Sequence, residues 1–256
     1  MPSECMPEAG VEDLLRLMDA CGIERAVCFA PFVRQFEELG WDDPNVWLAE
    51  QIAGQDRLLG FGNLAPQRPE SLETLARLPE LGLRGLKLHP AIEQFDLTDP
   101  QALDFYAAAA ELGLPLDFHS GPHHYSLAAG AVLKHDEIAW AVPGAVQIME
   151  HAGGIPFYYD ALAVIGNTYG EHPRVYAGIA SVLNPKIRLW HLGGERIEEM
   201  SRILGAEALI YGLDFPYNRT EEVRADLEIC RSLDLGPGGQ EALLGANLAR
   251  LLNVPW

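Results

Sequence analysis

Short apolar runs alternate with amphipathic segments along most of the chain. Seven of these runs predict buried strands, beginning at about residues 26, 58, 83, 114, 147, 174 and 209. Between the runs, apolar residues recur at helical spacing and glycine or proline marks the ends, which predicts helices over 11–21, 41–52, 69–78, 100–112, 135–142, 155–170, 195–204, 221–233 and 240–252. Strand centres recur about every 30 residues, the length of one strand–helix unit. The pattern therefore favours parallel strands joined by helices.

This repetition predicts one (β/α)8 barrel of the TIM type, a single domain over residues 1–256 without a change in composition. The main alternative is a doubly wound open sheet. Such a sheet usually has a glycine-rich phosphate turn after its first strand, whereas the first strand here leads into Pro31-Phe-Val-Arg. Because only seven strands are predicted, we expect an almost complete barrel in which one strand is missing. An open seam should then separate strand 26–31 from the strand that ends at Asp214.

Three of the predicted strands end in residues that commonly bind metals. His119 and His151 each end an apolar run just before a glycine turn, and Asp214 ends another run. Since parallel barrel strands all end on one face, these three side chains are expected to converge there. Imidazole and carboxylate groups are typical ligands of zinc and other divalent ions. One histidine alone is more often a hydrogen-bonded core residue, but three candidates at matched strand ends favour a metal site.

Other polar residues are predicted near the same strand ends. Alternation places Lys87 and His89 on the inner face of their strand, with Asp117 on the neighbouring strand. A buried lysine must be paired, solvated or modified. Three roles stay open for Lys87: a carbamylated metal bridge, an ammonium that binds a substrate carboxylate, or a salt bridge to Asp117. With Tyr217, these residues are candidates for binding substrate. The remaining histidines are expected to be solvated or structural: His123, His124, His135, His172 and His191.

The composition narrows the class of protein. A formal net charge of −19 disfavours nucleic acid as a partner, because phosphate binding depends on clusters of lysine and arginine. The 4 cysteines are scattered without a Cys-x-x-Cys pair, which argues against a disulfide scaffold or zinc ribbon and suggests a reducing compartment. No apolar run approaches the ~20 residues needed to span a bilayer, and the acidic N-terminus does not resemble a signal peptide. The sequence thus predicts a cytoplasmic protein that binds a small molecule and no membrane.

Five motifs in order give the chain a family resemblance. They are Gly85-Leu-Lys-Leu-His-Pro90, Leu116-Asp-Phe-His-Ser-Gly121, Glu150-His-Ala-Gly-Gly154, Tyr211-Gly-Leu-Asp-Phe-Pro-Tyr217 and Leu244-Gly-Ala-Asn-Leu-Ala-Arg-Leu-Leu252. Over roughly residues 11–252 the chain resembles the amidohydrolase-related branch of the amidohydrolase superfamily. That branch contains metal-dependent hydrolases and decarboxylases. The resemblance implies that His119 binds metal, that Asp214 is a ligand or base, and that His151 binds metal or orients water and substrate.

The resemblance implies a metal-dependent hydrolase that acts on a small carboxylated or cyclic substrate. The divalent ion, zinc or alternatively manganese, would polarise a carbonyl or activate water, and Asp214 would move the proton with His151 beside it. Two alternatives remain. One is a decarboxylase of the same family, and the other is a non-catalytic relative that binds a small molecule in the barrel mouth.

The chain departs from the family pattern at its start. The family opens on a strand with Asp-x-His-x-His, which supplies metal ligands, whereas residues 1–9 contain no such motif. Pro2 and Pro7 also disfavour a replacement strand there, because proline has no N–H to donate. We expect either that the start site is misassigned or that part of the metal site has been lost and the metal is weakly held. If the sequence is complete, a partner subunit, such as a second copy in a homodimer, is expected to cover the seam.

Overall fold

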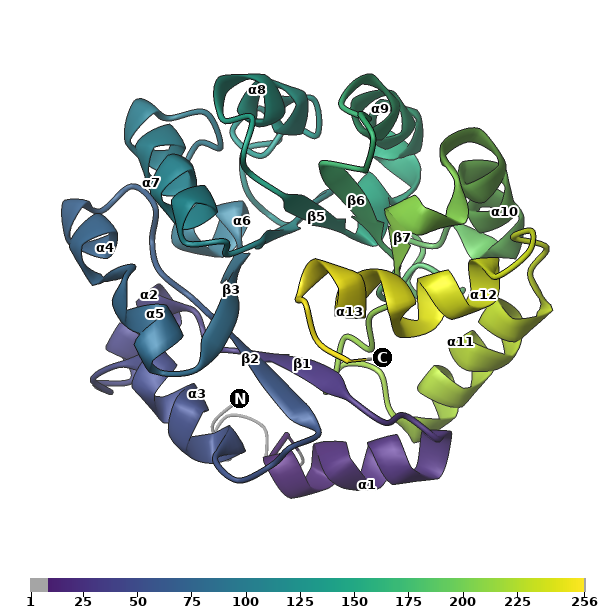
Figure 1. The fold of residues 1–256 in the computed structure, drawn as a ribbon, viewed down its shortest axis with the longest axis horizontal. Coiled ribbons are helices and arrows are strands. Elements are labelled where there is room, and N and C mark those ends of the chain that lie inside the picture. Colours follow the sequence, from purple (N-terminus) through teal and green to yellow (C-terminus); the bar gives the residue numbers. More distant parts are fainter. Residues whose placement is uncertain (1–8, 256) are drawn as a thin grey trace.

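The computed structural model describes residues 9–255 and shows a curled, seven-stranded sheet surrounded by helices (Figure 1). The strands follow one another in chain order, and each pair of neighbours is parallel. They are β1 (Ala26–Phe29), β2 (Leu58–Gly62), β3 (Leu83–Leu88), β4 (Leu116–His119), β5 (Gln147–Glu150), β6 (Val175–Gly178) and β7 (Leu209–Ile210). All seven predicted strands are therefore confirmed.

Helices connect the strands and form the outer layer of the barrel (Figure 1). They are α1 (Val11–Cys21), α2 (Val33–Glu38), α3 (Pro44–Ile52), α4 (Pro69–Thr74), α5 (Arg77–Glu80), α6 (Pro90–Glu93), α7 (Pro100–Glu111), α8 (Lys134–Ala141), α9 (Gly154–Asn167), α10 (Gly193–Leu204), α11 (Thr220–Ser232), α12 (Gly239–Glu241) and α13 (Asn247–Leu251). Single turns η1 (His151–Gly153) and η2 (Ala206–Ala208) and the π-type turn η3 (Ala242–Ala246) complete the chain. The short helices α2 and α6 were not predicted, because neither is long enough to show helical periodicity, and the helix predicted over 69–78 is divided into α4 and α5.

Caps explain where several helices begin and end. The Asp99 side chain accepts a hydrogen bond from the backbone N–H of Gln101 at the start of α7, and Asp43 does the same at the start of α3. Proline occupies the first turn of both helices, where its missing N–H leaves no bond unmade. Gly22 ends α1 in the left-handed region at φ 69°, which costs glycine little.

The inner and outer faces of β3 are as the alternation predicts. Leu86 and Leu88 are fully buried in an outer cluster that contains Phe105 of α7. Gly85 lies on the inner face, where an added Cβ would come within 2.6 Å of the Phe61 ring. Lys87 shares that face and lines the interior cavity. The prediction that Lys87 points into the barrel is confirmed.

The barrel has an open seam, as predicted. Within residues 9–255, β1 and β7 are the outer strands of the sheet and do not pair with each other. The C-terminal segment covers the β7 edge: the N–H of Tyr211 donates to the Leu243 carbonyl, and the Asn247 side chain donates to the Leu209 carbonyl. This segment is not the continuous helix predicted over 240–252, because Gly245 takes an extended φ of 164° inside it.

Two further expectations from the sequence concern the N-terminus and membrane spans. Residues 1–9 were expected to form no replacement strand, and residues 1–8 lie outside the described part of the chain. Among residues 9–255, no helix is both long and apolar enough to cross a membrane.

Candidate functional site

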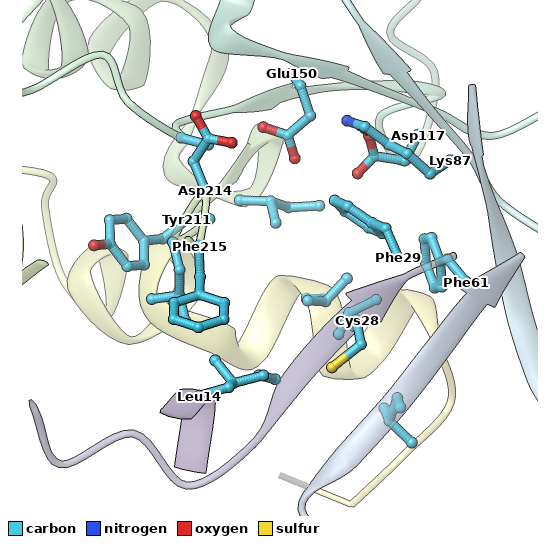
Figure 2. A pocket seen from close by; sticks show the side chains of 18 of the residues that line it. Leu14, Cys28, Phe29, Phe61, Lys87, Asp117, Glu150, Tyr211, Asp214 and Phe215 are labelled. Atoms are coloured by element: carbon cyan, nitrogen blue, oxygen red, sulfur yellow. Dashed lines mark hydrogen bonds and ion pairs between the residues drawn. The ribbon is translucent and has the colours of Figure 1, made fainter. Parts of the chain in front are cut away.

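A cavity of about 1520 Å³ extends from the C-terminal strand ends through the barrel interior to the seam. Histidines and Asp214 line it at the strand ends, and apolar side chains of β1 and the C-terminal segment line it at the seam. Figure 2 shows Lys87, Asp117, Glu150 and Asp214 along one side of the cavity, with Phe29 among the rings that face them. The cavity therefore joins a polar end, suited to chemistry, to an apolar end.

Three histidines form an imidazole cluster at the mouth: His89, His119 and His123. His89 directly follows β3 and caps α6, where its Nδ1 accepts a hydrogen bond from the Ile92 N–H at 3.4 Å. His119 is the last residue of β4, and its ring stacks on that of His89 with centroids 3.9 Å apart and an interplanar angle of 9°. His123 comes from the following loop, with its ring centroid 4.7 Å from that of His89 and 4.9 Å from that of His119.

His151 lies on the other side of His119, with ring centroids 4.9 Å apart. Its Nδ1 lies 2.7 Å from the carbonyl oxygen of Ala180, to which it donates, so the Nε2 keeps a free lone pair. Trp190, from the loop between β6 and α10, packs over His151 at a centroid distance of 4.0 Å and also contacts His119. The indole thus covers the imidazoles from the side of the solvent.

A short hydrogen-bonded chain holds Asp214. The Ser181 hydroxyl donates to Asp214 Oδ2 at 2.5 Å, and the Asn218 amide donates to the same hydroxyl at 2.9 Å. Asn218 is buried and also donates to the carbonyl of Leu213, which fixes the turn after β7. These contacts hold Asp214 by Oδ2, and the residue lines the cavity.

A second polar layer lies deeper in the barrel. Lys87 Nζ donates to Asp117 Oδ1 at 2.5 Å, and both side chains are almost fully buried. Burial lowers the pKa of Lys87, but the carboxylates of Asp117, Glu150 and Asp214 outweigh this and raise it. Burial first, and then the neighbouring Asp117, raise the pKa of Glu150 well above its usual range. One lysine thus balances one carboxylate, and burial favours the protonated form of Glu150.

The imidazoles at the mouth are kept neutral. Burial, reinforced by the neighbouring histidines and Lys87, lowers the pKa of His89 to about 2 and that of His119 well below its usual range. Burial also lowers the pKa of His151 to about 4, against the opposing effect of Asp214. Neutral imidazole is the form that binds a metal or accepts a proton.

This donor set fits a divalent ion. His119 Nε2 is buried and has no hydrogen-bond partner among residues 9–255, so its lone pair is left for a ligand. The nitrogens of the imidazole cluster include one from each ring that all lie within 4.8 Å of one another. Imidazole suits zinc, and it binds other transition metals as well.

The predicted metal ligands share the cavity but do not form a single tight group. His119, His151 and Asp214 all line it. Within the described residues, however, the group of three candidate ligands with mutual distances under 4.8 Å is His89, His119 and His123. The ligand roles of His119, His151 and Asp214 stay predictions.

Three other expectations concern residues of the site. The salt bridge between Lys87 and Asp117, one of the three alternatives for that lysine, is present. The substrate-binding roles of Lys87, His89, Asp117 and Tyr217 stay predictions, although all four line the cavity. His123 was expected to be solvated; it is only partly buried, and its ring packs against two buried imidazoles. Nothing in the local sequence around His123 indicates this, since the path of the loop brings the ring back.

Comparison with known proteins identifies the fold. A model of the amidohydrolase family matches residues 2–254. An uncharacterised TIM-barrel protein from Bordetella bronchiseptica has a TM-score of 0.78 and 20% sequence identity, over 95% of this chain and 83% of that chain. Among curated proteins, none matches the sequence significantly.

Two further solved structures share the fold. A dihydroxybenzoic acid decarboxylase from a Polaromonas species, with bound manganese and the inhibitor 2-nitroresorcinol, has a TM-score of 0.73 and 16% identity, over 99% of this chain and 90% of that chain. A putative 2-pyrone-4,6-dicarboxylic acid hydrolase from Pseudomonas putida has a TM-score of 0.68 and 19% identity, over 95% and 87%. The seven-stranded sheet is thus a TIM-type barrel, as predicted, with the seam where an eighth strand would close it.

Proposed function

The chain belongs to the amidohydrolase family, and from this premise we propose that it acts as a metal-dependent hydrolase on a small carboxylated or cyclic substrate. The observation that carries the proposal is the convergence of neutral imidazoles and the Asp214 carboxylate on one cavity at the strand ends. Strand ends are where barrel enzymes place their chemistry.

The metal assignment centres on His119, with His151 and Asp214 as the ligands predicted from the sequence. The buried, unpartnered Nε2 of His119 supports this role. A divalent ion, zinc or manganese, supplies Lewis acidity that polarises a carbonyl or activates water.

The residues around His119 have distinct tasks. Asp214, oriented by the Ser181 hydroxyl, takes a proton from water or returns it to the leaving group. His151 is fixed by the Ala180 carbonyl, so its Nε2 lone pair has one of two roles: it binds the metal, or it accepts a hydrogen bond from water or a substrate hydroxyl. Trp190 excludes bulk water and offers a flat face to a planar substrate.

Decarboxylation is the second candidate reaction. The manganese-containing decarboxylase shares this fold, and burial raises the pKa of the Glu150 carboxyl, which favours a proton there near the polar end of the cavity. Loss of CO2 from a ring requires that a proton replace the carboxylate on carbon, so a protonated group in the cavity suits this reaction.

The test measures both reactions with one protein. The chain is purified without chelator and supplied with zinc or manganese. Hydrolysis of small lactone carboxylates is followed by acid release, and decarboxylation of hydroxybenzoates by CO2 release. Asp214→Asn should lower kcat by at least about 100-fold in the active assay, because it removes the proton-transfer group. The control is His172→Ala, which removes an exposed histidine that does not line the cavity and should leave kcat unchanged. Metal-loaded protein that binds substrate analogues but turns over neither class would indicate a non-catalytic relative.

A further inference from the structure

We propose that His89, His119 and His123 together form a transition-metal site, in which His89 and His123 complete the coordination around His119. The inference rests on the proposed function in one respect, because His119 is a metal ligand in both. The other ligands differ, and His151 and Asp214 are left free to act on the substrate.

Geometry is the first argument. One nitrogen from each of the three rings lies within 4.8 Å of the other two. A tetrahedral zinc with Zn–N bonds of about 2.0–2.1 Å needs nitrogens about 3.4 Å apart, so the rings must close by at most about 1.4 Å. His123 comes from a loop and is only partly buried, so it is free to supply most of this movement.

The hydrogen bonds of the cluster leave one nitrogen directly available. His119 Nε2 is buried and unpartnered within the described part of the chain. His89 Nδ1 accepts from the Ile92 N–H over 3.4 Å, so Nε2 carries the proton of the neutral ring, and a metal ion at His89 must replace this long hydrogen bond. A buried acceptor without a partner normally needs an explanation, and a metal ion provides one.

The stacking of His89 on His119 makes a specific structural prediction. Their planes are 9° from parallel at a centroid distance of 3.9 Å, so their in-plane lone pairs lie in two nearly parallel planes. Two such lone pairs cannot both aim at one ion unless the rings tilt apart. Metal binding should therefore open the stack, with the ring of His119 turning toward His123.

The ligand type predicts which metals bind. Three neutral nitrogens favour nickel and zinc over manganese, since imidazole suits the later first-row ions and carboxylate oxygens suit manganese. A site made from His119, His151 and Asp214 would instead include a carboxylate and accept manganese more readily.

The experiment is direct titration of the metal-free protein with zinc chloride, nickel chloride or manganese chloride by calorimetry, without any substrate. His89→Ala and His123→Ala should each weaken zinc binding by at least about 10-fold, because even residues that only support a metal ligand cost that much. Asp214→Asn and His151→Ala should keep the wild-type affinity within about threefold. His172→Ala is the control for loss of an exposed histidine.

The outcomes separate the two proposals. If Asp214→Asn and His151→Ala weaken zinc binding whereas His123→Ala does not, the imidazole cluster is not the site, and the proposed function stands with its predicted ligands. If wild-type protein binds none of the three ions, both the cluster and the metal dependence fail. His123→Ala is the decisive variant, since His123 lies in a loop and its loss should not affect folding, which circular dichroism checks.

Discussion

Removing the ammonium of Lys87 should destabilise the protein strongly, because this lysine neutralises a carboxylate inside the barrel. Lys87 is 7% exposed and Asp117 2% exposed, and their charged atoms are 2.5 Å apart. Lys87→Met keeps the length of the side chain but leaves the carboxyl of Asp117 without its cation. Breaking a buried pair in this way costs about 3–5 kcal/mol, far above the ~1 kcal/mol upper range for exposed pairs.

The loss of stability in Lys87→Met should become smaller at lower pH. Burial raises the pKa of Asp117, and Lys87 opposes that rise. In Lys87→Met the opposing effect is gone, so Asp117 takes up a proton more readily. A protonated carboxyl is tolerated in the interior, and the difference in unfolding free energy between variant and wild type should therefore shrink as the pH falls from 7 to 5.

Urea unfolding followed by tryptophan fluorescence measures both effects. The control is Lys186→Met, which removes a 79% exposed lysine that pairs with Glu222 at 3.3 Å and should change stability by less than about 1 kcal/mol. A Lys87→Met/Asp117→Leu double variant should recover much of the loss, since it removes the unpaired charge as well. Two results would refute the view that Lys87 neutralises a buried carboxylate. One is a loss of unfolding free energy in Lys87→Met as small as that in Lys186→Met, and the other is no recovery in the double variant.

Three further predictions concern other parts of the molecule. Burial lowers the pKa of His135 to about 4 from about 6.5, so wild-type stability should fall by up to about 3 kcal/mol as the pH drops through that range, and His135→Gln should flatten this part of the pH profile. Phe118→Ala should cost about 3–5 kcal/mol in urea unfolding, because the ring is fully buried, whereas Leu112→Ala, at 42% exposed, should cost less than about 1. Trp190→Ala should raise KM for a planar substrate by about 10-fold through loss of a stacking face, and should leave zinc affinity unchanged; an unaltered KM would show that the indole beside His151 does not contact substrate.

The order of the strands could be predicted from the sequence because each one is a short apolar run bounded by turn residues. The inner face of β3 also followed from alternation, since Gly85, Lys87 and His89 are two residues apart. The C-terminal segment was less predictable. Its apolar spacing suits one continuous helix. The Leu243 carbonyl, however, accepts a hydrogen bond from the Tyr211 N–H beside β7, and the helix is interrupted at Gly245.

The site was only partly predictable for a related reason. Strand ends bring His119 and His151 together, and this depends only on topology. His123 joins them through the path of a loop, which no periodicity encodes. Glu150 was visible only as the residue before His151, and the pKa of its carboxyl is raised by burial and by Asp117 on the neighbouring strand.

Backbone strain gives independent support for placing the function at the strand ends. His151, Ser181 and Asp214 have φ values of 63°, 60° and 53°, a left-handed conformation that costs residues with a side chain about 1–2 kcal/mol each. They follow three neighbouring strands, β5, β6 and β7, and hydrogen bonds of their own side chains hold them: His151 to Ala180, and Ser181 to Asp214. Packing alone does not require three strained residues at one end of a barrel. The strain directs an imidazole and a carboxylate into the same cavity, and such orientation is what a catalytic site needs.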